Sequence, residues 1–277
     1  MIQPSHRSSL VSRSRAVFVI AAALAIAATP SSARLLKTRQ PGQRAGPLQF
    51  TVGSGFEYET DGEESEYGLP FLAEYGFAGG LKLALQPSAV WVHKKRGASL
   101  SGLGDFESTL TWELPTERRT RPGLALEGTV KWPTARRGEL GTGERDITLG
   151  VLVGKELVAC NLELNAGYTL MGDPPGAELQ DVLEFALATE YHLRPELDLL
   201  AEVVTASGAG GRRKTAGSLS GFGNIGGPEQ GQRETEATLG LARTFNAFLK
   251  LELGGVIKSG GSVQAVVAWE WDFGGGQ

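Results

Sequence analysis

Apolar and polar residues alternate along most of this chain, in segments of about ten residues separated by breaks. The clearest segment covers residues 263–273, where Val263 and Trp271 lie on one face and Gln264 and Glu270 lie on the other. Alternation with a period of two predicts a β-strand, and about ten residues is the length of a tilted strand that crosses a bilayer. The pattern therefore predicts strands that span a membrane.

About twelve segments between Leu48 and Phe273 show this alternation. The predicted strands are residues 48–59, 67–75, 80–92, 105–114, 123–132, 145–155, 158–170, 180–193, 196–205, 233–244, 247–257 and 263–273. Pro87 lies inside the third segment. Because proline has no amide hydrogen for a strand ladder, we expect a bulge or an early strand end there.

The connections between the predicted strands alternate in length. Short or modest turns follow the second, fourth, sixth, eighth and tenth strands, and longer polar connections follow the first, third, fifth, seventh and ninth. Residues 206–232 form the longest connection, whereas residues 258–262 are an exception because they are few. Outer-membrane barrels have short periplasmic turns and longer external loops. The sequence thus predicts an all-β fold, a transmembrane antiparallel up-and-down β-barrel with both ends in the periplasm.

The polar face of the predicted strands is strongly charged, which indicates that it faces a lumen and that the apolar face contacts lipid. A soluble barrel has the same period with its apolar face inward. Twelve strands, however, enclose a lumen wider than that of an eight-stranded barrel, and an apolar interior of that width is hard to fill. The residues predicted to line the lumen are Glu57, Glu74, Glu107, Glu113, Glu127, Lys131, Glu163, Glu184, Glu190, Glu202, Glu236, Lys250, Glu252 and Glu270.

Large aromatic residues lie near the ends of the predicted strands. They form two groups, one for each end of the barrel, which is the arrangement that membrane barrels show at the two interfaces between lipid and water. The residues predicted to form these belts are Trp91, Trp112, Trp132, Trp269, Trp271 and Phe273. The belts and the charged face together disfavour the alternative of a soluble periplasmic β-protein.

The first 33 residues have the pattern of an export signal. Arg7, Arg13 and Arg15 precede an apolar run at residues 16–29, which is too short for a spanning helix. Small residues at 31–33 offer a cleavage site, and residues 25–27 offer an alternative. We therefore expect a signal peptide at residues 1–33, a flexible periplasmic leader at 34–47 and the barrel at 48–277, located in a Gram-negative-type outer membrane.

Charge and cysteine content narrow the possible partners. Removal of the signal would take away three basic residues and no acidic residue, and would lower the formal net charge from −4 to −7. This acidic balance disfavours a nucleic-acid partner. The single cysteine, Cys160, excludes an internal disulfide. The expected partners are outer-membrane lipid and lipopolysaccharide, the barrel-insertion machinery and a small-molecule solute, and no cofactor is expected.

Two glycine-rich segments precede predicted strands. One contains Gly102, Gly104 and Asp105, and the other contains Gly141, Gly143 and Asp146. A Gly-x-Gly pair can bind phosphate, but that chemistry needs a helix to follow. Because strands follow here, we interpret the glycines as structural residues that allow tight loops at the rim of the barrel.

These segments resemble the outer-membrane transporters grouped under the name "MetA-pathway of phenol degradation". The matching patterns are Gly-x-Gly-Asp at residues 102–105, Lys-x-Pro-Thr at 131–134, Leu-Gly-Thr-Gly-x-x-Asp at 140–146 and Asn-x-Gly-Tyr at 165–168. The close match covers roughly residues 102–170. The resemblance implies an outer-membrane barrel that takes up small, often aromatic, molecules. The C-terminus departs from the usual aromatic ending, because Phe273 is followed by three glycines and Gln277.

An enzymatic function has little support in the sequence. His93 and His192 are the only histidines beyond the signal. His93 neighbours Lys94, Lys95 and Arg96, a cationic cluster suited to lipopolysaccharide phosphates. A barrel phospholipase needs a Ser–His pair that faces lipid, whereas the alternation puts His192 on the polar face. No Cys/His cluster supports a metal site.

The pattern best predicts a barrel for passive passage of small solutes. Thirteen acidic residues on the polar face, Asp272 included, against few lysines would concentrate cations in a confined lumen. We therefore expect a cation preference. The alternative is a non-conducting structural or surface-interaction barrel, closed by paired Glu and Lys or Arg side chains or by the long connection at residues 206–232.

Overall fold

The structure is a computed structural model that describes residues 36, 49–115, 121–136, 140–141, 143–173, 179–207, 234–246 and 249–273. The chain divides into two units, Met1–Pro30 and Ser31–Gln277, and every described residue belongs to the second unit. The predicted signal peptide, most of the predicted leader and the long connection at 208–233 lie outside the described residues. Among the described residues, no helix is long and apolar enough to cross a membrane.

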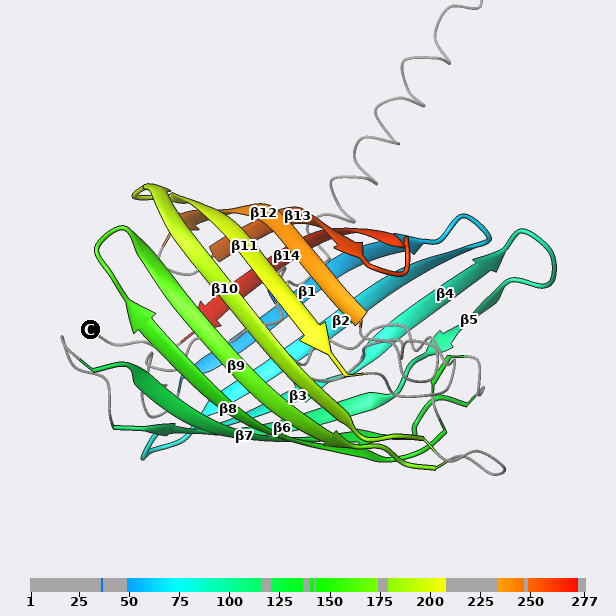
Figure 1. Cartoon of the computed structure of the whole chain (residues 1–277), viewed down its shortest axis with the longest axis horizontal. Coiled ribbons are helices and arrows are strands. Elements are labelled where there is room, and N and C mark those ends of the chain that lie inside the picture. The colour runs from blue at the N-terminus through cyan, green and yellow to red at the C-terminus, as the bar shows by residue number, and fades with distance from the viewer. Residues whose placement is uncertain are drawn as a thin grey trace, which may run out of the picture. The chain divides into compact units, whose positions relative to one another are not determined.

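The described strands form one closed antiparallel sheet (Figure 1). They are β1 (Phe50–Thr60), β2 (Glu64–Gly76), β3 (Leu81–Gln86), β4 (Ser88–Lys94), β5 (Leu100–Leu103), β6 (Phe106–Leu114), β7 (Gly123–Trp132), β8 (Asp146–Glu156), β9 (Cys160–Leu170), β10 (Val182–Arg194), β11 (Leu197–Ala206), β12 (Glu234–Asn246), β13 (Leu249–Lys258) and β14 (Val263–Phe273). From β6 to β14 each strand pairs with the next one in the chain, which confirms the predicted up-and-down order.

The barrel closes where the first strand meets the last. β1 pairs with β14 along its whole length, from Phe50 opposite Phe273 to Thr60 opposite Val263, and it also pairs with β2. The fourteen labelled strands correspond to twelve full strands of the barrel wall, which we call staves. β3 and β4 are two halves of one stave, and β5 and β6 are two halves of the next. The predicted number of about twelve strands is therefore confirmed.

Pro87 separates β3 from β4, as the sequence predicts, but the stave does not stop there. β4 begins at Ser88, and the alternation continues across the break because Gln86, Ser88 and Val90 are all buried. The stave that includes β6 is also longer than predicted, because β5 extends it through Leu100–Leu103 alongside β4. A four-residue strand with a central glycine is too short to show a period in the sequence.

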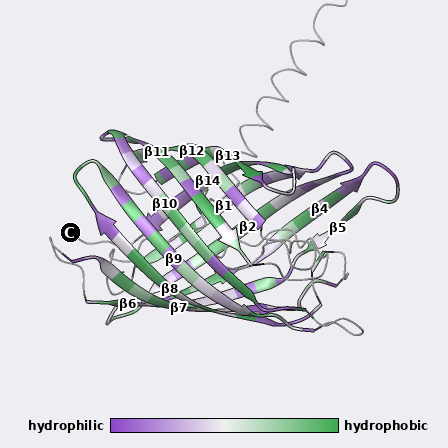
Figure 2. Ribbon diagram, in the orientation of Figure 1, coloured by the Kyte–Doolittle hydropathy of each residue, from purple (hydrophilic) through white to green (hydrophobic). Residues whose placement is uncertain are grey.

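Burial alternates along β6, β8 and the first part of β10, where the large apolar residues are the exposed ones. Figure 2 shows hydrophobic and hydrophilic residues alternating along the strands. In β6, Glu107 is 2% exposed whereas Leu110 is 51% exposed. In β8, Leu149 is 62% exposed between two buried neighbours, Thr148 and Gly150. In a soluble protein the leucines would be buried and the carboxylates would be exposed. This barrel has the opposite distribution, which is the one expected for a barrel whose outer surface contacts lipid.

The two ends of the barrel carry connections of different length. Residues 133–145, 171–181 and 207–233 are long connections at the end that we call the outer end, and residues 157–159 and 195–196 are tight turns at the other, periplasmic end. The connection after β1 is shorter than predicted. It contains only residues 61–63, because Asp61 Oδ1 accepts hydrogen bonds from the amides of Glu63 and Glu64 and lets β2 begin early.

Candidate functional site

The inner face of the barrel is the candidate site, because it gathers the charged residues of all the staves. The residues predicted to line a lumen all lie on the inward side of the alternation. Glu107, Glu113, Glu127, Lys131, Glu163, Glu184, Glu202, Glu236 and Glu252 are buried, and Glu57, Glu74, Glu190, Lys250 and Glu270 are partly buried. Burial of so many carboxylates in one wall gives the interior an acidic character.

Lysines on the same inner wall form ion pairs with some of these acids. Lys82 Nζ lies 2.6 Å from Glu113 Oε1, between the adjacent strands β3 and β6. Lys258 on β13 reaches across β14 to Glu59 on β1, at 3.0 Å. A buried charge needs such a partner, since an ion without one loses its hydration and gains nothing in return.

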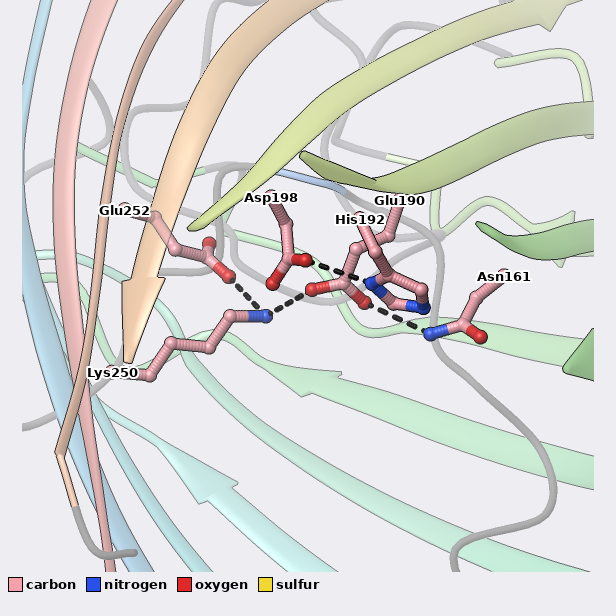
Figure 3. A network of polar contacts seen from close by, with 6 residues as sticks. All are labelled: Asn161, Glu190, His192, Asp198, Lys250 and Glu252. Atoms are coloured by element: carbon pink, nitrogen blue, oxygen red, sulfur yellow. Dashed lines mark hydrogen bonds and ion pairs between the residues drawn. The ribbon is translucent and has the colours of Figure 1, made fainter. Parts of the chain in front are cut away.

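A polar network near the periplasmic end joins three staves (Figure 3). Lys250 Nζ lies 2.8 Å from Glu190 Oε1 and 3.2 Å from Glu252 Oε1, so its side chain links β13 to β10 across two intervening strands. Asn161 on β9 donates a hydrogen bond of 3.3 Å to Glu190 Oε2. These side-chain contacts therefore connect strands of the inner wall that are not neighbours in the sheet.

His192 and Asp198 lie beside this network, on β10 and β11 (Figure 3). His192 Nδ1 is 2.8 Å from Asp198 Oδ1, and both residues belong to the inward side of their strands. His93, the other candidate from the sequence, lies at the outer end and contacts Ser99 Oγ at 2.8 Å. Within the described residues, no group of three or more His, Cys, Asp and Glu side chains could hold a metal ion.

An apolar patch interrupts the charged inner wall. It consists of inward-facing residues of β11 to β14, namely Leu200, Ala242, Val256, Val266 and Ala268. Leu36, from the predicted leader, packs against this patch. Sequence reasoning missed the patch because it assigned one polar face to each strand, although Val266 and Ala268 were visible on the polar side of residues 263–273.

A second apolar cluster lies inside the barrel at the outer end. Val90 and Val92, on the inward side of β4, pack with Leu140 from the connection between β7 and β8. Leu100 and Ala135 complete the cluster. Leu140 is 2% exposed, so this connection places a leucine on the inner wall.

The glycine-rich rim segments surround this second cluster. Asp105 Oδ1 accepts a hydrogen bond of 3.1 Å from the backbone amide of Ala135. A Cβ on Gly141 would lie 2.5 Å from Asp105 Oδ1, and one on Gly102 would lie 2.8 Å from Leu140 Cδ1. At position 141, therefore, close packing requires glycine, whereas at position 102 a Cβ would have to displace the end of the Leu140 side chain.

The other rim residues position neighbouring loops. The amide of Gly104 donates a 3.0 Å hydrogen bond to the carbonyl of Ser88, and Gly143 has a left-handed φ of 74°. Asp146 accepts a 2.9 Å hydrogen bond from the amide of Gly172 and forms an ion pair with Lys131. The two aspartates thus attach successive outer connections to the strands below them.

The aromatic residues of the predicted belts lie on the outward side of their strands. Trp91, Trp112 and Phe273 are exposed, and Trp132, Trp269 and Trp271 are partly buried. Trp132 Nε1 donates a 2.9 Å hydrogen bond to Ser108 Oγ, and Arg145 lies 4.8 Å from the centre of its ring. The rings of Trp271 and Phe273 stack with centroids 6.0 Å apart.

A closed twelve-stave barrel with an apolar outside and a charged inside defines the class of outer-membrane β-barrels. The chain is similar to the COG4313 outer membrane channel from Pseudomonas putida F1, with a TM-score of 0.61 and 16% identity over 85% of this chain and 100% of that chain. It is also similar to the NanC porin, with a TM-score of 0.52 and 9% identity over 80% and 98% of the two chains. At these identities the similarity concerns the fold alone.

No family model and no curated protein matches the sequence. The resemblance to the transporters named for phenol degradation therefore stays a prediction. The two solved structures named above are described as an outer membrane channel and as a porin.

Proposed function

We propose that this protein is an outer-membrane channel for passive passage of small solutes. The single observation that carries the proposal is the closed barrel whose lipid-facing side is apolar and whose inner wall holds buried, paired charges. A barrel that served only as a membrane anchor would not need an acidic interior, because ionised side chains are costly to bury without water. A hydrated passage explains why the acids are there.

The carboxylates of the inner wall support a preference for cations. Acidic rings in a confined lumen raise the local concentration of cations and lower that of anions. The apolar patch around Leu200 and Val256 offers a second kind of contact on the same wall. An acidic wall beside an apolar patch suits small solutes with an apolar body, such as the aromatic molecules that the family resemblance implies.

Export and assembly belong to the same proposal. The signal pattern at residues 1–33 would direct the chain out of the cytoplasm, and the insertion machinery would place the barrel in the outer membrane. His93 and Lys94, at the outer end of β4, would then face lipopolysaccharide phosphates.

The proposal is tested by recording currents from the full mature chain in planar bilayers. We expect discrete conductance steps in potassium chloride for protein whose folded state is verified by its shift in electrophoretic mobility on heating. Liposome swelling with small sugars and with small aromatic acids and amines then ranks the solutes. Folded protein that gives no steps and no swelling would refute the channel function.

A specific observation favours the alternative, a barrel that does not conduct. Leu36 packs on the inner apolar patch, and Lys250 and Lys258 cross neighbouring strands to reach acids. Such contacts narrow the interior. The same recordings distinguish the two functions, because a structural barrel remains silent at every voltage.

A further inference from the structure

The hydrogen-bonded ladder between β1 and β2 covers only part of the two strands. It joins residues 57–60 of β1 to residues 65–68 of β2, and none of the ladder pairs between these two fully described strands involves residues 50–56. The other side of β1 differs, because β14 pairs with it along its whole length. We call the stretch of wall where residues 50–56 adjoin residues 69–75 the β1–β2 seam.

The β1–β2 seam is bounded at both ends. The ladder closes its outer end, and at its periplasmic end the amide of Gly76 donates a 2.8 Å hydrogen bond to the carbonyl of Gln49. That contact has the same register as the pair of Glu57 with Gly68, so the two strands run side by side along the seam (Figure 1). At about 3.3 Å per residue the seam is roughly 20 Å long, which is a large part of the thickness of a bilayer's hydrocarbon core.

Proline and glycine weaken the pairing of the two strands at the seam. Pro70 lies opposite Gly55 in this register, and proline has no amide hydrogen to donate to a neighbouring strand. Gly53 and Gly55 bring no side chains to the inner side of β1. The carbonyl of Pro70 accepts a 2.7 Å hydrogen bond from Ser54 Oγ. This side-chain contact closes the seam on the lipid side, where Ser54 is only 2% exposed.

The inner side of the seam is apolar. Pro70 and Leu72 lie on the inward side of β2, and Leu72 is 6% exposed. On β14, the strand beyond β1, Ala268 belongs to the apolar patch and lies opposite Gly55. The apolar patch thus continues across the glycines of β1 to the seam. The other side of the seam faces lipid, where Phe71 is exposed.

We propose that the β1–β2 seam is a lateral exit, through which small uncharged apolar solutes such as toluene leave the barrel for the lipid. The inference rests on the proposed channel function and deepens it, because it names a solute class and its route. Parting two strands elsewhere would break ladder pairs along their length, and lipid offers the released backbone groups no new partner. At the seam the strands part without breaking a ladder pair. Lipid does not hydrate an ion, so ions stay within the barrel.

The first test measures how well the amides of the seam are protected. The register points the amides of Thr51, Gly53 and Gly55 toward β2. We expect their hydrogen exchange, followed by NMR on the barrel in micelles, to be about tenfold faster than that of Gly150, whose strand has ladder pairs on both sides. Pro70→Ala supplies a donor opposite Gly55 and should slow the exchange at Gly55. Protection of the seam amides equal to that of Gly150 would overturn the inference.

The second test locks the seam with a disulfide. Val52 and Ala73 lie opposite each other in the same register, on the outward side of the two strands, so Val52→Cys with Ala73→Cys should cross-link them in a Cys160→Ser background. The readout is uptake of radiolabelled toluene by cells that express the protein, above the rate of cells without it. We expect oxidation to lower this uptake about fivefold and a reductant to restore it. Conductance in potassium chloride should stay unchanged, because neither side chain faces the interior.

Val151→Cys with Ala166→Cys, in the same background, is the matched control. These residues are ladder partners on the outward side of β8 and β9, and the same two residue types are replaced. Their disulfide joins strands that the ladder already holds together, so we expect oxidation to change neither uptake nor conductance. Heat-modifiable mobility verifies that both double variants are folded before and after oxidation.

The outcomes separate the inference from the function on which it rests. If the natural protein conducts, and toluene uptake is either absent or unchanged by the locked seam, the lateral exit is wrong and the channel function stands. If the protein neither conducts nor raises toluene uptake, both are wrong. If the two disulfides lower uptake equally, a stiffer wall explains the effect and the inference is wrong.

Discussion

Two glycines at the outer rim, Gly141 and Gly143, have different structural reasons for lacking a side chain. Gly141 has no left-handed backbone, yet a Cβ there would lie 2.5 Å from both Asp105 Oδ1 and Ala135 Cβ. Gly143, two residues later, has a φ of 74° and open space around it. Two glycines of one short motif thus serve different purposes, one for close approach and one for chain direction.

We predict that Gly141→Ala destabilises the barrel. The added methyl group must displace the Asp105 carboxylate or Ala135, and overpacking of this kind costs about 1–3 kcal/mol. The free energy of unfolding in guanidinium, measured on barrels in detergent micelles, gives the effect. Gly260→Ala is the matched control, since no atom lies within 4 Å of a Cβ there and its φ is not left-handed. Equal stability of the two variants would contradict the packing argument.

Sequence reasoning reached these rim residues without reaching their partners. The glycine pattern and the two aspartates are visible in the chain, and their structural role was predicted. The contact between Asp105 and Ala135, however, joins residues 30 positions apart in two connections. The alternation period and the strand propensity of the residues do not indicate which loops contact each other. Only the folded structure therefore shows that Leu140 points inward.

Strands are the scale at which the sequence is most informative. β7 and β14 begin and end at the predicted residues, because each is a long alternating run that a turn residue bounds on at least one side. Shorter or interrupted pieces were harder to predict. The sequence does not predict β5. It predicts the start of β2 three residues late, because backbone amides that donate to Asp61 Oδ1 form a tight turn and let the strand begin before its apolar run.

The two faces of β7 give a direct test of strand orientation. Leu126 is exposed and its neighbour Glu127 is buried, where it accepts a 3.1 Å hydrogen bond from Thr111. Leu126→Arg places a charge against lipid near the middle of the strand, which costs about 2–4 kcal/mol at the bilayer midplane. We predict a strong loss of folded barrel in the outer membrane, measured by heat-modifiable mobility.

Glu127→Gln is the control for that experiment. It removes a charge from the inner wall, keeps the shape of the side chain and leaves an oxygen that can accept from Thr111. We therefore expect nearly normal assembly. If Glu127→Gln impaired assembly as much as Leu126→Arg, the assignment of lipid and interior to the two faces would be wrong.

At the scale of the whole molecule, closure creates contacts that no single strand predicts. Lys250 and Glu190 lie 60 residues apart on strands separated by two others, and Lys258 and Glu59 lie 199 residues apart across the closing strand pair. The acidic interior was predictable from alternation. The acids with which its few lysines pair, and the contacts that gather the apolar patch, depend on the curvature that brings distant staves within reach.

The last prediction concerns the charge that the closed barrel presents to a passing ion. Lys250 is partly buried on the inner wall between Glu190 and Glu252, so Lys250→Gln removes the positive charge that offsets these acids. Under a potassium chloride gradient we predict a cation-selective reversal potential for the natural protein, and roughly twofold higher cation-to-anion permeability for Lys250→Gln.

Lys155→Gln is the control, because Lys155 lies near the same end of the barrel on the outward side of β8. Raising the salt concentration should weaken the selectivity of every variant, since the Debye length shortens to about 3 Å at 1 M. An anion-selective reversal potential, or equal shifts for the two lysine variants, would show that the inner wall does not govern ion selection.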